Sequence, residues 1–246
     1  MDNTSSIKKY KNSVTRKYIS LSNNEIDTIK KGDYWVSKKF DGQLWFYCKS
    51  NKTSKIINSN ESDISNIVQD IKKDLDKKLS KSKSVILAGE LYYLTDQRER
   101  YGDTISGLGD KSKRKNLRFG VFDVVHLEKL LSNFENKYNF LKKTIGLKTK
   151  EFSHVLEHKK IKQNEISKLF KNNVEKNDAE GLIVKNNSIV YKIKKEETAD
   201  LLITGYTLGS KTNQIRSISL GVFLNEKEIM HVGSCGNIPT NIRKDL

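Results

Sequence analysis

Proline is almost absent from this sequence, and cysteine is scarce. Its 246 residues include one proline, Pro239, and two cysteines, Cys48 and Cys235, which form no Cys-x-x-Cys pair. Turns must therefore depend on Gly, Asn and Asp, and neither a disulfide framework nor a cysteine-rich zinc site is expected. This cysteine usage favours an intracellular protein, in the cytoplasm or the nucleus.

Long apolar runs are also missing. Because no run of about eighteen apolar residues occurs, no membrane span is expected, and the N-terminal residues MDNTSSIKKYKNS lack the apolar core of a secretory signal. His154 and His158 stand four residues apart without a third metal ligand beside them, so we interpret both as ordinary polar residues. The length suits one large domain, or one domain followed by a small second one.

Acidic residues are outnumbered by basic ones. The chain has 46 Lys and Arg against 30 Asp and Glu, which gives a net charge of +16. An excess of this size favours a polyanionic partner, because each neutralised phosphate releases counterions. Base composition of the genome is the alternative explanation for the abundance of Lys and Asn. Charge alone therefore favours a nucleic-acid partner without establishing one.

Hydrophobic periodicity predicts an α+β fold in two domains. Three segments have helical spacing, and several others are rich in β-branched and aromatic residues. The expected helices are 62–80, 136–146 and 164–177, and the expected strands are 84–94, 117–127, 152–161, 180–186 and 188–195. From Ala199 the pattern becomes all β, so we predict one domain over residues 1–199 and a second over 200–246.

The segment YWVSKKFDGQLWFYCKS, Tyr34 to Ser50, predicts a β-hairpin. Its two strand-forming runs flank Asp41 and Gly42, and both residues tolerate the backbone of a tight turn. Lys39 lies two residues before Asp41, so the hairpin would present this lysine at its end.

Several strand segments carry a charged residue where a half-buried strand favours an apolar one. Taken singly, each is most simply explained as an exposed position on a two-faced strand. In chain order they are Lys39 and Asp41 in KFDG, Glu90 in AGELYY, Asp123 in FGVFDVV, Glu180 in EGLIVK, and Lys192 and Lys194 in YKIK.

This ordered set resembles the covalent nucleotidyltransferase superfamily of polynucleotide ligases and mRNA capping enzymes, and most of all the ATP-dependent DNA ligases. KFDG matches the Lys-x-Asp-Gly nucleophile motif, and the other four segments match further motifs in the family's order. The resemblance implies an adenylation domain of antiparallel sheets flanked by helices. The three strands after Ala199 look like the start of the OB-fold β-barrel domain of DNA ligases, apparently incomplete at residue 246.

The resemblance also implies roles for these residues, with ATP and Mg²⁺ as cofactors. Lys39 would attack the α-phosphate of ATP to give a lysyl-AMP. Nearby cations (Lys38, Lys192, Lys194 and a bound metal) would help by favouring its neutral amine. Asp41, Lys192 and Lys194 would assist catalysis, and Glu180 would bind Mg²⁺. The nucleotide would be bound by Lys39, Glu90 at the ribose, Phe122 at the adenine, Lys185, Lys192 and Lys194.

Three alternatives to a DNA ligase remain open from the sequence. Leu44 stands where DNA ligases usually have an arginine, and some RNA ligases lack that arginine too, so an RNA ligase is the runner-up. A GTP-using capping enzyme and a non-catalytic nucleic-acid-binding module are the others. The family's C-terminal basic motif would lie beyond Leu246, which implies either a longer protein or an impaired first step. The expected partner is nicked duplex DNA or RNA, bound by a monomer.

Overall fold

The structure is a computed structural model that describes residues 3–51, 53–128, 131, 133–196, 198–209, 214–236, 238–239 and 241–244. The chain divides into two units, Met1–Glu196 and Glu197–Leu246. This division lies next to the boundary expected at residue 199, although the first and last two residues of the expected domains lie outside the described ranges. No helix among the described residues is long and apolar enough to cross a membrane.

Among the residues that the structure describes, the first unit holds all five α-helices and ten of the strands. The helices are α1 (Asn3–Ser13), α2 (Gln69–Lys78), α3 (Tyr101–Gly109), α4 (Phe134–Thr144) and α5 (Ile166–Phe170). The strands are β1 (Ile19–Ser22), β2 (Asp33–Lys39), β3 (Gln43–Ser50), β4 (Thr53–Ile57), β5 (Ser84–Tyr93), β6 (Leu117–Leu127), β7 (Ser153–Val155), β8 (Lys159–Lys162), β9 (Gly181–Lys185) and β10 (Val190–Lys194).

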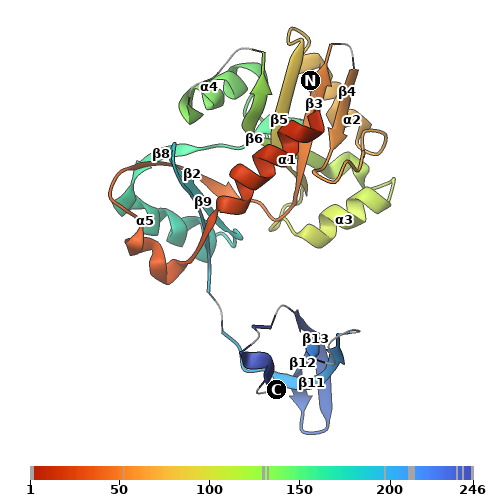
Figure 1. The fold of residues 1–246 in the computed structure, drawn as a ribbon, viewed down its shortest axis with the longest axis vertical. Helices are drawn as coiled ribbons and strands as arrows, with labels where there is room; N and C mark the ends of the chain where they lie inside the picture. Colours follow the sequence, from red (N-terminus) through yellow and green to blue (C-terminus); the bar gives the residue numbers. More distant parts are fainter. Residues whose placement is uncertain are drawn as a thin grey trace. The chain divides into compact units, whose positions relative to one another are not determined.

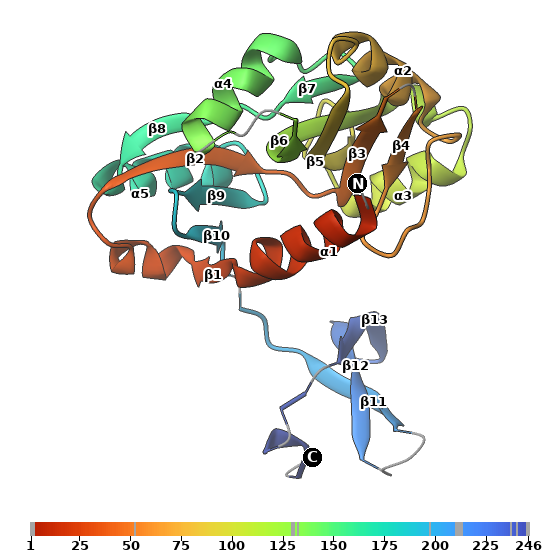
Figure 2. The same ribbon diagram turned by 45° about the horizontal axis from the view of Figure 1, so that its top comes forward.

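These strands form two separate five-stranded sheets (Figures 1 and 2). We call β1-β10-β9-β2-β8 the first sheet and β4-β3-β5-β6-β7 the second sheet. Most neighbours are antiparallel, as expected, but each sheet has one parallel pair, β1 with β10 and β7 with β6. The fold of this unit is therefore α+β with mixed sheets.

The hairpin predicted at Asp41 and Gly42 is wrong. β2 pairs with β8 and β9, whereas β3 pairs with β4 and β5, so the chain crosses from the first sheet to the second between Lys39 and Gln43. Neither Asp41 nor Gly42 is among the described residues with positive φ. Gly42 is required for another reason: a Cβ there would lie 2.3 Å from the backbone oxygen of Leu91. Glycine thus allows the crossing to approach β5 closely.

The single strand predicted over 152–161 is also two strands. β7 extends the second sheet beside β6, and β8 extends the first sheet beside β2. The chain crosses back between the sheets through Leu156, Glu157 and His158. A segment that looks like one strand in sequence is therefore divided between the two sheets.

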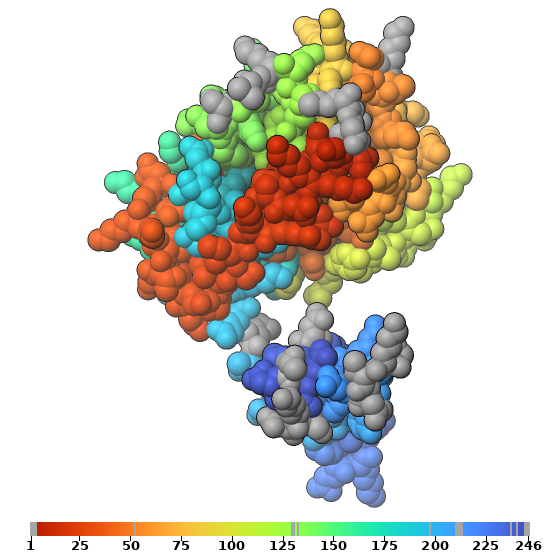
Figure 3. Space-filling model, viewed as in Figure 1, coloured from red at the N-terminus to blue at the C-terminus, as the bar shows by residue number. Residues whose placement is uncertain are grey.

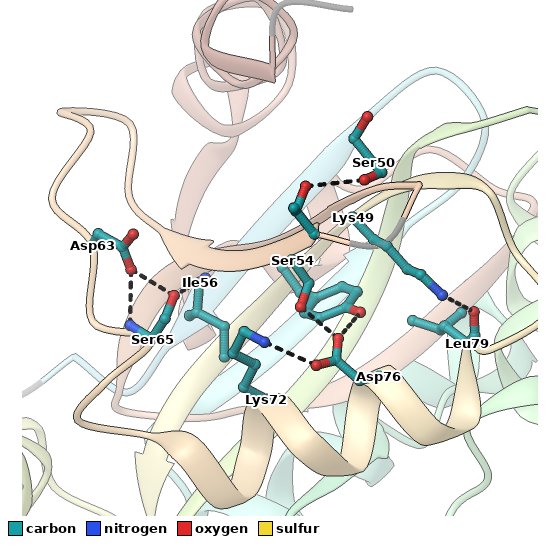
Figure 4. A network of polar contacts seen from close by, with 11 residues as sticks. Lys49, Ser50, Ser54, Ile56, Asp63, Ser65, Lys72, Asp76 and Leu79 are labelled. Atoms are coloured by element: carbon teal, nitrogen blue, oxygen red, sulfur yellow. Dashed lines mark hydrogen bonds and ion pairs between the residues drawn. The ribbon is translucent and has the colours of Figure 1, made fainter.

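Helix α2 packs on one face of the second sheet. Ile71 and Leu75 are fully buried, as the predicted helical spacing requires. Asp76 accepts hydrogen bonds from Tyr47 on β3 and from Ser54 on β4, and it pairs with Lys72 at 2.9 Å (Figure 4). The helix begins at Gln69 rather than near Ser62, because Asp63 instead bonds the Ser65 backbone and hydroxyl in a turn.

The N-terminal helix α1 was not predicted from its polar sequence. It covers the opposite face of the second sheet through Ile7 and Tyr10, which are 1% and 7% exposed. Lys11 donates to Ser59 Oγ at 2.7 Å, which ties the helix to the segment after β4. In the space-filling view α1, in red, lies on the surface beside the orange segment that contains β3 and β4 (Figure 3).

Other predicted elements are confirmed. β6 has the expected bounds, and α4 is followed by Gly146 with a φ of +87°, the left-handed conformation of a helix C-terminal cap. The second unit contains β11 (Leu202–Leu208), β12 (Ile215–Asn225) and β13 (Glu228–Gly236), joined in an antiparallel sheet. Among its described residues this sheet is open and forms no closed barrel.

Candidate active site

A cavity of about 190 Å³ lies where the two sheets of the first unit meet. The first sheet contributes Lys39, Lys185 and Lys192, and the second contributes Glu90 and Phe122. Five of the residues predicted for the nucleotide site therefore line a single cavity, although they are spread over more than 150 positions of sequence. Glu180 joins this group by pairing with Lys39, and Lys194 joins it by pairing with Glu180.

Strand alternation explains why the first sheet presents lysines here. On β10, Tyr191 and Ile193 belong to the apolar core, so Lys192 and Lys194 point to the other face. In register, both Lys39 on β2 and Lys194 on β10 stand opposite Gly181 on the central strand β9. A Cβ at Gly181 would lie 2.1 Å from the Ile193 backbone oxygen, so only glycine fits between these strands.

Glu180 directly precedes Gly181 and pairs with both Lys39 and Lys194. Its Oε2 accepts a short hydrogen bond from Lys39 Nζ, and its Oε1 lies 2.7 Å from Lys194 Nζ. Burial raises the pKa of the Glu180 carboxyl, but hydrogen bonds from Lys194 and Lys39 outweigh burial and lower it overall. Glu180 is therefore ionised at neutral pH and is the shared partner of both lysines.

Glu90 is the second carboxylate of the cavity, and its electrostatics differ from those of Glu180. Burial raises the pKa of Glu90 to about 7, although Lys39 acts in the opposite direction. Gly42 in the crossing donates its backbone N–H to this carboxyl group. Glu90 therefore changes charge near neutral pH, whereas Glu180 does not.

Lys192 is held in place by an aromatic ring. Its Nζ lies 4.7 Å from the ring centroid of Tyr18, which also lines the cavity. Burial, and then the neighbouring Lys39, lower the pKa of Lys192. A desolvated cation of this kind is poised to compensate negative charge on a bound phosphate.

Lys185 and Phe122 lie side by side in the cavity wall. Lys185 Nζ donates to the Phe122 backbone oxygen at 3.4 Å and lies 3.7 Å from the ring centroid of Phe134. Burial lowers the pKa of Lys185 to about 8. The Phe122 side chain reaches the cavity next to this buried amine, as expected for a ring that would contact a base.

The structure does not reproduce the contributions to the site that were expected of Asp41 and Lys38. Asp41 lies on the crossing and is not among the residues that line the cavity, so its catalytic role remains a prediction. Lys38 was expected to act on Lys39, but it pairs with Glu99 at 2.6 Å and lies over the ring of Phe40. Its charge is therefore balanced by a nearly buried carboxylate.

The sequence reasoning missed several residues of the site. Tyr18 and His158 line the cavity, and Tyr10 on α1 donates to Asp123 Oδ2 at 2.8 Å, beside Phe122. Lys137 also pairs with Asp123, at 3.2 Å. The one available signal was the aromatic character of Tyr10 and Tyr18 in an otherwise polar N-terminal segment.

The donor set suits a metal ion brought by the substrate. Among the described residues no group of three or more His, Cys, Asp and Glu side chains could hold a metal ion. Mg²⁺ is commonly held by one or two carboxylates together with substrate phosphates, and Glu180 and Glu90 supply two carboxylates near Lys39. The residues present therefore fit an Mg²⁺ ion that arrives with a triphosphate.

Two mixed sheets that meet at a cavity lined by lysines, an aromatic ring and a carboxylate are the arrangement expected of a covalent nucleotidyltransferase. Residues 16–202 match the family model described as "ATP dependent DNA ligase domain". Because the match covers most of the chain, the protein belongs to the ATP-dependent DNA ligase family. Helix α1 and most of the second unit lie outside it.

Solved structures of DNA ligases share this fold. One described as Pmar-Lig_Pre has a TM-score of 0.65 at 14% identity, over 96% of this chain and 60% of that one. A Lig E DNA ligase has a TM-score of 0.64 at 16% identity, with coverages of 93% and 87%. The ligase domain of LigD from M. tuberculosis has 0.53 at 15%, with coverages of 95% and 78%.

This chain is shorter than the two Pmar-Lig proteins that it resembles in fold. This chain spans only 60% and 62% of the two Pmar-Lig structures. No curated protein matches the sequence. The comparisons thus establish the family and the fold of this chain.

Proposed function

We propose that this chain is the catalytic part of an ATP-dependent DNA ligase that seals nicks through a lysyl-AMP intermediate. The observation that carries the proposal is the position of Lys39. Its amine lies at a cavity with an aromatic wall, and it is bound by a carboxylate that also holds Lys194. A purely nucleic-acid-binding module has no use for a carboxylate that holds two lysines beside a cavity.

In the first step, the neutral amine of Lys39 would attack the α-phosphorus of ATP. A bond from Nζ to phosphorus would form, the bond from phosphorus to the bridging oxygen would break, and pyrophosphate would leave. The proton of the ammonium must be lost first, and release from Glu180 would permit this. Lys192 and Lys194 would then counter the charge that develops on the phosphate oxygens.

The remaining side chains would bind and orient the nucleotide. Phe122 would stack on the base, Glu90 would contact the ribose, and Lys185 would lie beside the base. Glu180, once released by Lys39, would hold Mg²⁺, which supplies charge neutralisation at the phosphates. Asp41 would act from the crossing near the ribose and the leaving group.

Incubation with labelled ATP and Mg²⁺, followed by denaturing electrophoresis and intact-mass measurement, tests the proposal. The wild-type protein should gain one AMP, and Lys39→Ala should gain none while remaining folded. Lys39→Arg should also fail, because a guanidinium stays protonated. Lys159→Ala, an exposed lysine on the edge strand of the same sheet, is the matched control. If Lys39→Ala were labelled as fully as the wild-type protein, Lys39 would not be the nucleophile. If the wild-type protein were labelled by GTP and not by ATP, a capping enzyme would be favoured.

An RNA ligase is the second candidate, favoured by Leu44. This residue lines the cavity, and an apolar side chain cannot bind a phosphate as the arginine usual in DNA ligases does. Family membership supports DNA over RNA. Pre-adenylated nicked DNA and the matching nicked RNA duplex separate the two, because pre-adenylation bypasses the first step. Sealing of the RNA nick alone would contradict the proposed DNA substrate.

Nicked duplex DNA should be bound by a monomer through charge. With a net charge of +16, binding should weaken by roughly 0.9 log units per log unit of salt for each phosphate contacted. A titration of labelled duplex at several salt concentrations measures this slope. Binding that is independent of salt would contradict a backbone-contacting role.

A further inference from the structure

His158 is buried at the nucleotide cavity with one ring nitrogen unpaired. The side chain is 5% exposed, and it lines the cavity where the chain crosses back to the first sheet. Its Nδ1 lies 2.8 Å from the Leu156 backbone oxygen. Its Nε2 is buried and has no hydrogen-bond partner among the described residues. Since a buried polar atom without a partner is costly, a ligand is the natural source of one.

The hydrogen-bonding character of this nitrogen follows from its surroundings. A backbone carbonyl can only accept, so Nδ1 must carry the proton and Nε2 must present a lone pair. Burial, reinforced by Lys185, holds the pKa of His158 well below its usual range, so the ring stays neutral. Phe134 and Tyr138 pack against the ring at centroid distances of 5.0 and 5.2 Å. Nε2 is therefore an acceptor in a ring with little freedom to turn.

Purine bases differ in what they offer to such an acceptor. Adenine has an amino group at C6, which donates, whereas guanine and hypoxanthine have an oxygen there, which only accepts. At N1 the order is reversed, since adenine accepts and the 6-oxopurines donate. Lys185, which lines the same cavity, is a donor. The cavity thus offers an acceptor, on His158, and a donor, on Lys185, to the edge of a base.

We propose that His158 reads the base of the nucleotide: its Nε2 accepts a hydrogen bond from the 6-amino group and so selects adenine over 6-oxopurines. The inference rests on the proposed function, because it concerns the same nucleotide site. A 6-oxopurine in this position would place its oxygen against the lone pair of Nε2. Purine itself, with hydrogen at C6, would leave the acceptor unpaired.

His154 provides a matched control. It is also buried, at 1% exposed, and its Nδ1 is also without a partner among the described residues. Its Nε2, however, lies 3.2 Å from the Tyr92 hydroxyl, and it does not line the cavity. A change at His154 tests the loss of a buried imidazole without touching the proposed base contact.

The test compares His158→Phe, His154→Phe and the wild type with three triphosphates: ATP, ITP and purine riboside triphosphate. Adduct formation is followed by mass, and calorimetry measures binding of the corresponding monophosphates. The wild type should prefer the adenine nucleotide to purine riboside by about tenfold to a hundredfold, and should disfavour inosine further. His158→Phe should bring the ratios close to one, and His154→Phe should leave them unchanged.

The possible results distinguish a failure of the base-reading inference from a failure of the proposed function. If adducts form but the ratios are equal in wild type and His158→Phe, the base-reading role is overturned and the proposed function stands. If no nucleotide binds or reacts, both fail. Should His158→Phe not fold, ¹⁵N NMR of the wild-type imidazole decides: AMP should shift the Nε2 resonance and IMP should not. Equal shifts, or none, would overturn the inference.

Discussion

The two sheets of the first unit face the same cavity but are covered differently. The second sheet is packed on both faces, by a large apolar cluster under α2 and α4 and by a smaller one under α1. The first sheet has one apolar cluster, which includes Val184, Ile193 and Phe170. Its other face carries Lys39, Lys185 and Lys192 toward the cavity.

Because of this difference, we expect the second sheet mainly to support the cavity and the first sheet mainly to carry the residues proposed for the reaction. A sheet covered on both faces has little freedom to shift, and it holds Glu90 and Phe122 as a fixed wall. A sheet with one open face can place several cations together, because the apolar residues of each strand all point the other way. Substitutions on the open face of the first sheet should therefore lower the adenylation rate more than the stability of the fold. Substitutions where the chain crosses to the second sheet should lower stability more than the adenylation rate.

After Lys39 itself, the largest expected effect is at Glu180, which pairs with two lysines of the first sheet. Glu180→Ala should slow adenylation by about a thousandfold, because it leaves Lys39 and Lys194 without their shared partner and removes the expected metal ligand. Glu180→Asp should lose less and should be partly rescued by extra Mg²⁺ or Mn²⁺. Single-turnover adduct formation measures both. Equal losses in the two variants, without rescue, would contradict metal binding by Glu180.

The two lysines of β10 should differ in importance. Lys192 is half-buried in the cavity against Tyr18, whereas the Lys194 side chain is 55% exposed. Lys192→Ala should therefore reduce adenylation by about a hundredfold and Lys194→Ala by about tenfold, since a desolvated cation interacts more strongly with developing charge. Thermal unfolding should change little in either variant. Parallel losses of stability and activity would instead indicate a structural role for these lysines.

A change at the crossing between the sheets should mainly affect stability. The Cβ of Gly42→Ala would meet the Leu91 backbone, which cannot move aside easily, so unfolding free energy should fall by about 1–3 kcal/mol. Gly102→Ala on α3 is the control, because nothing lies within 4 Å of its Cβ. Urea denaturation compares the two. An unchanged midpoint for Gly42→Ala would show that the crossing does not pack closely on β5.

A pH dependence of stability that comes from Glu90 should be similar in size to the effect at Gly42. Its pKa in the folded protein is raised to about 7, above its value near 4.3 in an unfolded chain. Stability from this group is therefore present below about pH 4 and is lost as pH rises toward 7. Glu90→Gln should gain stability over wild type by on the order of 1–3 kcal/mol between pH 5 and pH 8. Urea denaturation at both values tests this, and a constant difference would contradict the raised pKa.

Sequence reasoning singled out several residues of the cavity because short motifs along the chain carry them. Charged residues on strands, in an order that resembles the family's motifs, pointed to Lys39, Glu90, Glu180 and Lys192, and all four lie at or beside the cavity. Helical and strand periodicity predicted β5, β6 and α4 for the same reason. The polar sequence of α1 hid its role, since only Ile7 and Tyr10 pack inward.

The sequence by itself determined which residues could do the chemistry and which face of each strand they share, because side-chain alternation follows directly from residue spacing. Tertiary structure alone decided how the strands are grouped. An Asp-Gly pair is compatible with a turn and with a crossing, and the choice depends on long-range pairing of β2 with β9 and of β3 with β5. That grouping brings Lys39 to Glu180 and carries His158 to the cavity, at distances along the chain over which local pattern carries no information.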